Sequence, residues 1–281
     1  MQRRTSLFIL SKDTRDETIT AAAEAAAEQE AHLACLLLEA LPGPPSFAFG
    51  HSGYAALVAS DGPLERLRQN KAAAKKRVDD IETLLARSNC PGDVQFAVWS
   101  GNDIGLVAAR RALTCDIAQI ADDLTDPDPV FREATYGILF QSPVPLMLNG
   151  SPFAHRDRIF LAWDSSLSAA RAAHAALPYL RKASEVIIGC IDSDLSHGRD
   201  GEDPGTDIAA WLSHHGCAVT LSQFASNGQE IGTSIQSRVR EIGADLVVMG
   251  AYGHSRMRQA MFGGTTRTML QQTELPIFLA H

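Results

Sequence analysis

Apolar runs of strand length alternate with helical patterns through the second half of the sequence, and this alternation constrains the fold more than any other feature. The expected strands are residues 158–164, 185–192, 217–222, 245–249 and 276–280, and the expected helices are 168–182, 207–215, 230–242 and 265–272. Strands separated by helices return to the same sheet through crossover connections, which gives a parallel sheet covered on both faces. This half therefore predicts an open, Rossmann-like α/β domain.

The first half repeats this order less clearly. Its expected strands are residues 6–10, 32–38, 93–99, 116–121 and 144–148, and its expected helices are 17–30, 63–88, 103–113 and 129–139. The run after Asp116 matches the run after Asp245, which indicates an internal repeat. Residues 149–156 form a natural linker. The sequence thus predicts two tandem open parallel-sheet domains, residues 1–150 and 156–281, related by a pseudo-twofold axis.

The closing strands of the two domains, residues 144–148 and 276–280, are expected to lie beside one another. Pairing them would cover two exposed sheet edges at once. We expect each domain to keep its own sheet, so that one continuous sheet would contradict this arrangement. A further homodimer of the tandem chain stays open, although the fusion already supplies what a dimer of single domains would.

Composition and charge narrow the class of protein. Hydrophobic residues make up 45% of the chain and charged residues 21%, values typical of a soluble globular protein. The net charge of −8 argues against binding to nucleic acid or to an anionic membrane, and no apolar run approaches the roughly 20 residues of a membrane span. The N-terminal apolar run stops at Ser11, too short for an export signal, so we expect a cytoplasmic protein.

The cysteines give no sign of a metal or redox motif. All 5 are scattered along the chain, and none forms a C-x-x-C pair. Most lie in or beside apolar segments, where a free cysteine behaves as a small hydrophobic residue. Buried structural thiols are therefore expected, rather than a metal or redox site.

A glycine-rich, basic loop follows the run at residues 245–249. Its glycines and threonines include Gly250, Gly253, Gly263, Gly264, Thr265 and Thr266, and its basic residues are His254, Arg256 and Arg258. Glycines let the backbone approach a ligand closely, and the free amides at a helix start bind anions. The loop therefore predicts a site for a phosphate-bearing ligand. A plain strand–turn–helix connection with solvated basic side chains is the open alternative.

Residues that follow the other strands are expected at the same edge of the sheet, where open parallel sheets bind ligands. Asp164 follows the first strand of the second half. It could accept hydrogen bonds from an adenine amino group or a ribose hydroxyl, or it could cap the next helix. The second strand ends at Cys190, Ile191 and Asp192, where backbone atoms could meet a base.

The first half differs from the second at the corresponding loop. After the run at 116–121 it carries Asp122, Asp123, Asp126 and Asp128, and it lacks the glycines and basic residues of the second half. Carboxylates repel phosphate groups, because both are negatively charged. We therefore expect the first half to bind no nucleotide.

The spacing Gly250-x2-Gly253-x9-Gly263 resembles the nucleotide loop of the universal stress protein family. Residues 156–281 resemble one domain of that family, which has an adenine nucleotide alpha hydrolase-like fold, and the whole chain resembles its tandem form. In that family the loop holds the phosphates of ATP, and the turn after the first strand lies against adenine and ribose. The resemblance therefore implies that the second half binds ATP, with or without Mg²⁺.

The resemblance also implies a set of cofactor-binding residues. Those at the nucleoside would be Ala162, Trp163, Asp164 and Cys190, and those along the loop Met249, Gly250, Gly253, His254, Arg256, Gly263, Gly264, Thr265 and Thr266. Gly264 departs from the family pattern, which usually has Ser, Thr or Asn there, and Trp163 is bulky for its turn. No catalytic or metal-binding residue is implied.

Three functions stay open at this point. The first is a cytoplasmic stress-response module that binds ATP and signals through its conformation or through partners. The second is a slow ATPase or nucleotidyl-transfer enzyme, against which stands the lack of an evident general base near the loop. The third is an interaction protein with an empty pocket, in which Trp163 and Gly264 mark a lost site.

Overall fold

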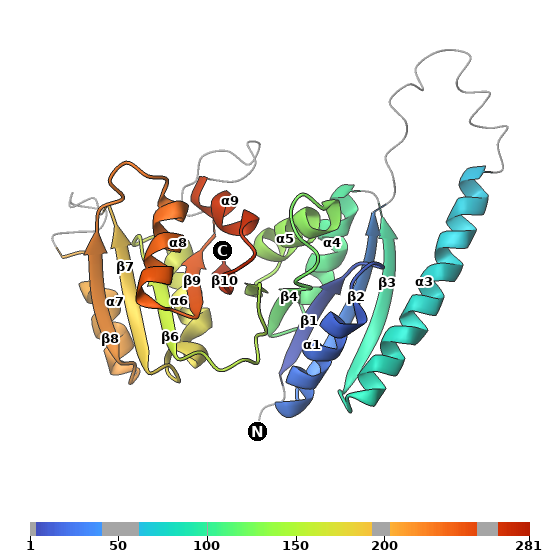
Figure 1. The fold of residues 1–281 in the computed structure, drawn as a ribbon, viewed down its shortest axis with the longest axis horizontal. Helices are drawn as coiled ribbons and strands as arrows, with labels where there is room; N and C mark the ends of the chain where they lie inside the picture. The colour runs from blue at the N-terminus through green and yellow to red at the C-terminus, as the bar shows by residue number, and fades with distance from the viewer. Residues whose placement is uncertain (1–3, 41–61, 100, 193–202, 252–263) are drawn as a thin grey trace, which may run out of the picture.

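The computed structural model describes residues 4–40, 62–99, 101–192, 203–251 and 264–281 (Figure 1). The first half contains β1 (Thr5–Leu10), α1 (Asp16–Glu28), β2 (His32–Ala40), α3 (Gly62–Arg87), β3 (Gly92–Trp99), α4 (Gly101–Ala112), β4 (Ile117–Ile120), α5 (Pro129–Gln141) and β5 (Leu146–Leu148). The second contains β6 (Arg158–Ala162), α6 (Leu167–Leu180), β7 (Glu185–Ile191), α7 (Thr206–His214), β8 (Val219–Phe224), α8 (Ile231–Ile242), β9 (Leu246–Gly250), α9 (Gly264–Gln271) and β10 (Ile277–Ala280). The expected order of strands and helices is confirmed, with boundaries shifted by a few residues.

The strands that the structure describes lie in one 10-stranded sheet, in the order β3-β2-β1-β4-β5-β10-β9-β6-β7-β8. Read inward from either end, the order is the third, second, first, fourth and fifth strand of that half, so both halves have the same topology. Neighbouring strands within each half run parallel. This arrangement confirms two open parallel-sheet units related by a pseudo-twofold axis between β5 and β10.

The halves meet where β5 and β10 pair in the antiparallel direction, with Ile277 opposite Leu148 and Leu279 opposite Leu146. The expected contact between the closing strands is confirmed. The expectation that each half keeps its own sheet is wrong, because the backbone ladder that covers the two edges also joins the two sheets. The strands left at the outer edges are β3 and β8.

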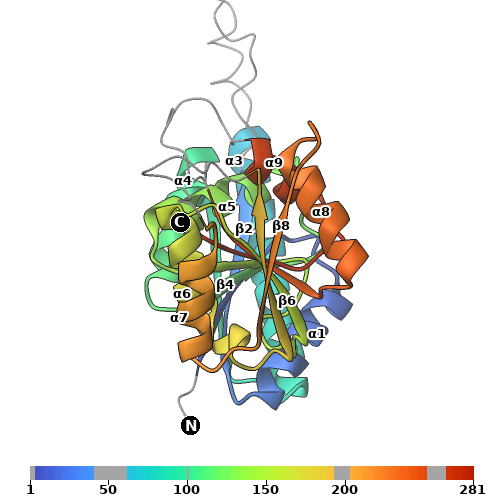
Figure 2. The ribbon, with the colours of Figure 1, turned by 90° about the vertical axis from the view of Figure 1, so that its left-hand side faces the viewer.

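Helices cover both faces of the sheet, as crossover connections require (Figure 2). In the second half, α6 and α7 lie on one face and α8 on the other. Phe8, Phe160 and Phe278 are among the largest fully buried side chains. Strands buried on both faces read as continuous apolar runs, which is why such runs located the strands in the sequence. Among the described helices, none has the length and apolar character needed to cross a membrane.

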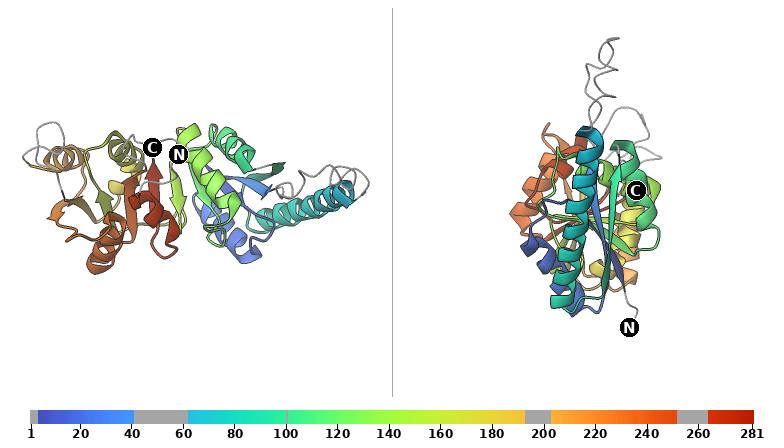
Figure 3. Two further views of the ribbon diagram at one scale, coloured as in Figure 1. Left: turned by 90° about the horizontal axis from the view of Figure 1, so that it is seen from above. Right: turned by 90° about the vertical axis from the view of Figure 1, so that its right-hand side faces the viewer.

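The long helix α3 runs beside β3 at the outer edge of the first half (Figure 3). Ile81 and Leu85 of this helix are buried. Arg77 donates to Asp16 Oδ1 at 2.6 Å and to the Thr14 carbonyl oxygen at 2.5 Å, which ties the helix to the start of α1. The helix therefore shields one side of the sheet while its charged faces meet solvent.

The expectation of buried thiols is confirmed. Cys35, Cys90, Cys190 and Cys217 are buried, Cys115 is half-buried, and all are free. Burial raises the pKa of Cys35, Cys90, Cys115 and Cys217 above that of an ordinary thiol. Because the thiolate is the reactive form, a raised pKa makes these side chains poor nucleophiles and poor metal ligands at neutral pH.

Candidate functional site

The candidate site lies at the carboxyl edge of the second half's sheet, between β6 and β9. β6 pairs with β7 on one side and with β9 on the other, so the connections that follow β6 and β9 diverge there. In open α/β sheets such a switch in strand order leaves a crevice that binds ligands. Ala162, at the end of β6, lies beside Gly189 and Met249 on the neighbouring strands. Strand order thus brings the turn after β6 and the start of the glycine loop together.

The turn after β6 presents Asp164 at this edge. The Trp163 backbone amide donates to the Gly189 carbonyl oxygen at 2.9 Å, which holds the turn against β7. Asp164 Oδ1 accepts from the Ser166 backbone amide at 3.1 Å. Ser166 Oγ in turn accepts from the Ala169 amide at 3.1 Å as the N-cap of α6. The helix is therefore capped by Ser166, and the carboxylate of Asp164 remains exposed.

Gly250 ends β9 against the first turn of α6. A Cβ atom at Gly250 would lie 2.5 Å from the Ser168 carbonyl carbon and 2.8 Å from Ser168 Oγ, distances at which atoms overlap. The close approach of β9 to the helix start therefore requires glycine, whatever ligand the loop holds. Loop spacing alone does not reveal this packing role.

Most of the glycine loop lies outside the described residues. The residues concerned are Gly253, His254, Arg256, Arg258 and Gly263. Both ends of the loop are described, with Gly250 at the end of β9 and Gly264 at the start of α9. The loop thus connects the candidate crevice to a helix N-terminus, where backbone amides and the helix dipole favour anions.

The start of α9 faces the carboxylate of Glu230. Glu230 caps α8, since its Oε2 accepts from the Thr233 backbone amide at 2.9 Å. Its Oε1 would lie 3.6 Å from a Cβ atom at Gly264, an ordinary contact distance. Among the described residues, nothing stands closer to a Cβ atom at Gly264 than this oxygen, so a negative charge lies near the expected phosphate position. Sequence reasoning missed Glu230, because only the packing of α8 against α9 brings it there.

Three of the remaining predicted residues have buried side chains, so these side chains do not face a ligand at the edge of the sheet. Cys190 is 1% exposed and Met249 is 4% exposed, and they belong to core clusters on opposite faces of the sheet. Thr266 is 5% exposed, whereas Thr265 before it is half-buried. A ligand at this edge would therefore meet the backbone of the three buried residues and the side chains of Thr265 and the half-buried Trp163.

At the corresponding edge of the first half, two of the aspartates accept hydrogen bonds from backbone amides at the starts of helices. Asp123 Oδ2 accepts from the Arg15 backbone amide at 2.8 Å, beside the start of α1. Asp128 Oδ1 accepts from the Val130 amide at 2.7 Å as the N-cap of α5. Burial, reinforced by the charge of Asp123, raises the pKa of Asp122. Carboxylates thus occupy helix starts in this half, which favours the expectation that it binds no nucleotide.

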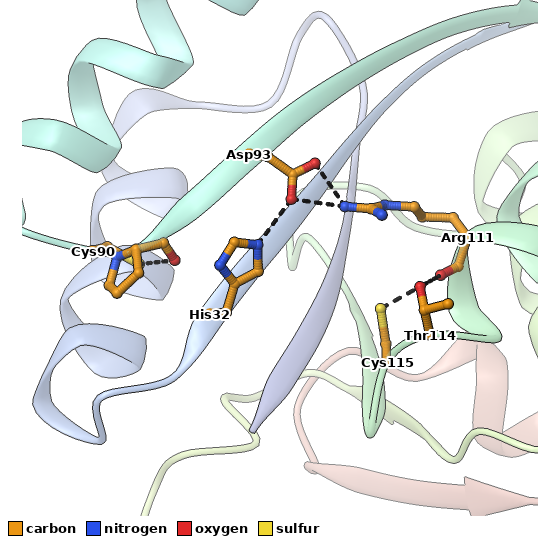
Figure 4. A network of polar contacts seen from close by, with 7 residues as sticks. His32, Cys90, Asp93, Arg111, Thr114 and Cys115 are labelled. Carbon is orange, nitrogen blue, oxygen red and sulfur yellow. Dashed lines mark hydrogen bonds and ion pairs between the residues drawn. The ribbon is translucent and has the colours of Figure 1, made fainter. Parts of the chain in front are cut away.

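A further polar network lies at the amino ends of the first half's strands (Figure 4). Asp93 Oδ1 lies 2.8 Å from His32 Nε2, and Arg111 Nη2 donates to both Asp93 oxygens, at 2.6 and 2.8 Å. The network ties β2, β3 and the end of α4 together, far along the strands from the carboxyl edge. Nothing in the sequence marked these three residues as a group. Within the described part of the chain, no group of three or more His, Cys, Asp or Glu side chains could hold a metal ion.

Comparison with known proteins gives a family match for the second half and similar solved structures for the whole chain. The model of the universal stress protein family matches residues 155–281. A universal stress protein from Archaeoglobus fulgidus DSM 4304 has a similar structure, with a TM-score of 0.65 and 13% sequence identity over 100% of this chain and 99% of the other. For a putative universal stress protein from Pseudomonas aeruginosa UCBPP-PA14, the TM-score is 0.59 at 16% identity, over 99% and 93% of the two chains. No curated protein matches the sequence.

The two structural likenesses extend over both halves of the chain, but at such low identity they concern the fold alone. The family match is a match of sequence, and it falls on the half that carries the glycine loop. The family match, the repeated strand order and the similarity of the whole chain to solved structures all indicate the same fold for the two halves. Residues 155–281 therefore match the universal stress protein family in sequence, and the chain as a whole has the fold of two such domains in tandem.

Proposed function

We propose that the second half binds ATP at the crevice between β6 and β9, and that the protein is a cytoplasmic, nucleotide-holding stress-response module rather than an enzyme. The observation that carries the proposal is where the two ends of the glycine loop lie, with Gly250 at the switch in strand order and Gly264 at the N-terminus of α9. A phosphate chain there would meet free helix amides. The match of this half to the universal stress protein family supports the same ligand.

The nucleoside would lie against the turn after β6. Asp192, at the end of β7, accepts from the Ser226 backbone amide at 2.9 Å, and hydrogen bonds from Ser226 lower the pKa of Asp192. Asp164 also accepts a backbone amide, but it does so within its own turn, through Oδ1. Because Asp164 follows β6 directly at the switch in strand order, it is the carboxylate better placed to accept from a ribose hydroxyl or an adenine amino group. Trp163 beside it would form one wall of the base pocket.

A binding role fits the carboxylates near the site better than a hydrolytic one. Asp164, Asp192 and Glu230 each accept a hydrogen bond from a backbone amide. Each carboxylate thus has one oxygen engaged within the protein, and hydrogen bonds from Ser226 also lower the pKa of Asp192, which weakens it as a proton acceptor. We therefore expect steady-state phosphate release from ATP to stay at the level of the buffer blank, and sustained release would favour the slow ATPase.

Titration calorimetry with ATP should give about one site per chain, because only the second half combines the glycine loop with a helix start. Nucleotide released by denaturing the purified protein, read from its absorbance spectrum, should be an adenine nucleotide. Two equivalent sites would contradict the asymmetry between the halves. No binding at all would favour the interaction protein with an empty pocket.

Replacing Glu230 with glutamine should strengthen ATP binding about threefold to tenfold, because it removes a negative charge near the expected phosphates. Adenosine affinity should not change, since adenosine carries no phosphate. The gain should shrink at high ionic strength, where exposed charges are screened. Calorimetry with ATP and adenosine at two salt concentrations measures all three effects.

Glu241 provides the matched control on the same helix. Its carboxylate pairs with Arg238 at 2.7 Å near the other end of α8. Glu241→Gln should therefore leave ATP affinity unchanged. Equal affinities for Glu230→Gln and the parent protein would mean that the phosphates lie away from the start of α9.

A further inference from the structure

A cavity of about 340 Å³ lies between the two halves, lined by residues of α5 and α9 and of the segment before α5. The helices α5 and α9 flank the boundary between the halves (Figures 1 and 3). The lining residues of the cavity are Asp126, Pro127, Phe131, Arg132, Thr135, Arg267, Leu270 and Gln271. This volume falls in the range of small-molecule sites, which occur preferentially where domains meet. The cavity is separate from the crevice between β6 and β9, and an inference drawn from it does not depend on ATP binding.

Both helices turn one face toward the cavity. On α9, Arg267, Leu270 and Gln271 recur at intervals of three and four residues, which places them on one side of the helix. Gln271 Nε2 donates to Asp126 Oδ2 at 3.3 Å, so a hydrogen bond between the halves closes one side of the cavity. A molecule in this space would contact both halves at once.

The charges around the cavity favour an anion. Two guanidinium groups line it, from Arg132 and Arg267, against the single carboxylate of Asp126. Arg132 Nε lies 3.7 Å from Asp126 Oδ1, so this pair is largely self-compensating. Arg267 is exposed and adds a positive charge that the lining does not balance. Guanidinium groups bind carboxylates through paired, charge-assisted hydrogen bonds.

A buried hydroxyl points to the same conclusion. Thr135 is 1% exposed, and its Oγ1 has no hydrogen-bond partner among the described residues. Buried polar groups nearly always have a partner, so an orphaned hydroxyl on the wall of a cavity marks a place for a ligand atom. The side chains of Phe131, Leu270 and Pro127 supply apolar wall around it.

We propose that this cavity binds a small organic carboxylate with an apolar body. Arg267 holds the carboxylate group, the Thr135 hydroxyl donates a hydrogen bond to it, and the body lies against Phe131 and Leu270. The ligand bridges the two halves and contacts α9, the helix that the glycine loop enters. The site thus connects the first half, which is expected to bind no nucleotide, to α9, the helix expected to contact the ATP phosphates in the second half.

The test uses 1-naphthoate and its uncharged counterpart 1-naphthamide, which have the same apolar body. Calorimetry on the full chain should show binding of naphthoate, and naphthamide should bind at least about tenfold more weakly, a loss equivalent to one charge-assisted contact. Arg267→Gln should weaken naphthoate by a similar factor. Arg171→Gln, which changes an exposed arginine on α6 away from the cavity, should leave naphthoate affinity unchanged.

Thr135→Val tests the hydroxyl with a side chain of nearly the same shape. The variant should be at least as stable as the parent, because it removes an unsatisfied polar group, and it should bind naphthoate several-fold more weakly. Naphthoate that does not bind at about 10 mM, or that binds equally to the parent and to Arg267→Gln, would overturn the proposal. Gly263→Val should keep full naphthoate affinity, so this proposal and ATP binding can fail separately.

Discussion

Replacing Gly263 with valine should abolish ATP binding while leaving the chain folded. Gly263 immediately precedes α9, and a branched side chain there would fill the space beside the amides expected to hold phosphate. We expect the affinity to fall at least about a hundredfold by calorimetry. The circular dichroism spectrum and the unfolding transition should change little, since loop substitutions are tolerated better than core substitutions.

Gly264→Ala is the matched control one residue later. A Cβ atom at Gly264 meets Glu230 Oε1 at 3.6 Å and no closer atom of the described residues, and the backbone there is not left-handed. We therefore expect this variant to fold normally and to keep ATP affinity within about threefold, since alanine suits a helix better than glycine. If Gly263→Val bound ATP as well as the parent protein, the pocket would lie elsewhere, and the family resemblance would describe the fold and not the ligand.

Gly250→Ala should destabilise the second half by about 2–3 kcal/mol, the upper part of the range for overpacked sites. Backbone and side-chain atoms of Ser168 stand where the added methyl group would be, and Ser166 holds that helix start by capping it. Relief would require α6 to move away from β9. The free energy of unfolding in urea, compared with that of Gly264→Ala, measures the effect.

A parent-like stability for Gly250→Ala would show that the first turn of α6 can shift without cost.

The expected result has a practical consequence for the ligand site. Variants of Gly250 would lose ATP binding through the fold as well as through the loop, so they cannot test phosphate contact by themselves. Gly263 is the more informative position for that question.

The order and type of the elements could be predicted because the inner strands are buried on both faces and read as apolar runs bounded by helical patterns. The edge strands β3 and β8 are more exposed, and their place followed from the alternation of strands and helices. The pairing of residues 146–148 with 277–279 followed from the cost of leaving two sheet edges open. The joining of the two sheets into one continuous sheet could not be predicted, because apolar runs carry no information on how sheets join.

The candidate site was predictable only where its determinants are local. The glycine spacing and the turn at Asp164 are visible in the sequence, whereas the capping role of Ser166 depends on where α6 begins. Glu230 and the wall of the cavity at Thr135 depend on helices far apart in the sequence, and no periodic pattern encodes such contacts. The boundaries at residues 150 and 156 and the full set of ATP-binding residues stay predictions.

The ladder between β5 and β10 is formed within one polypeptide, and this has a consequence for how such a protein can diverge. In an assembly of two identical chains, each substitution appears twice, so both subunits keep or lose a loop together. In the fused chain, residues 122–128 can change while residues 250–264 stay as they are. Dilution cannot separate the halves, so every molecule combines one half that carries the glycine loop with one half that lacks its glycines and basic residues. The covalent link thus makes asymmetry heritable, and frees one half for a different task.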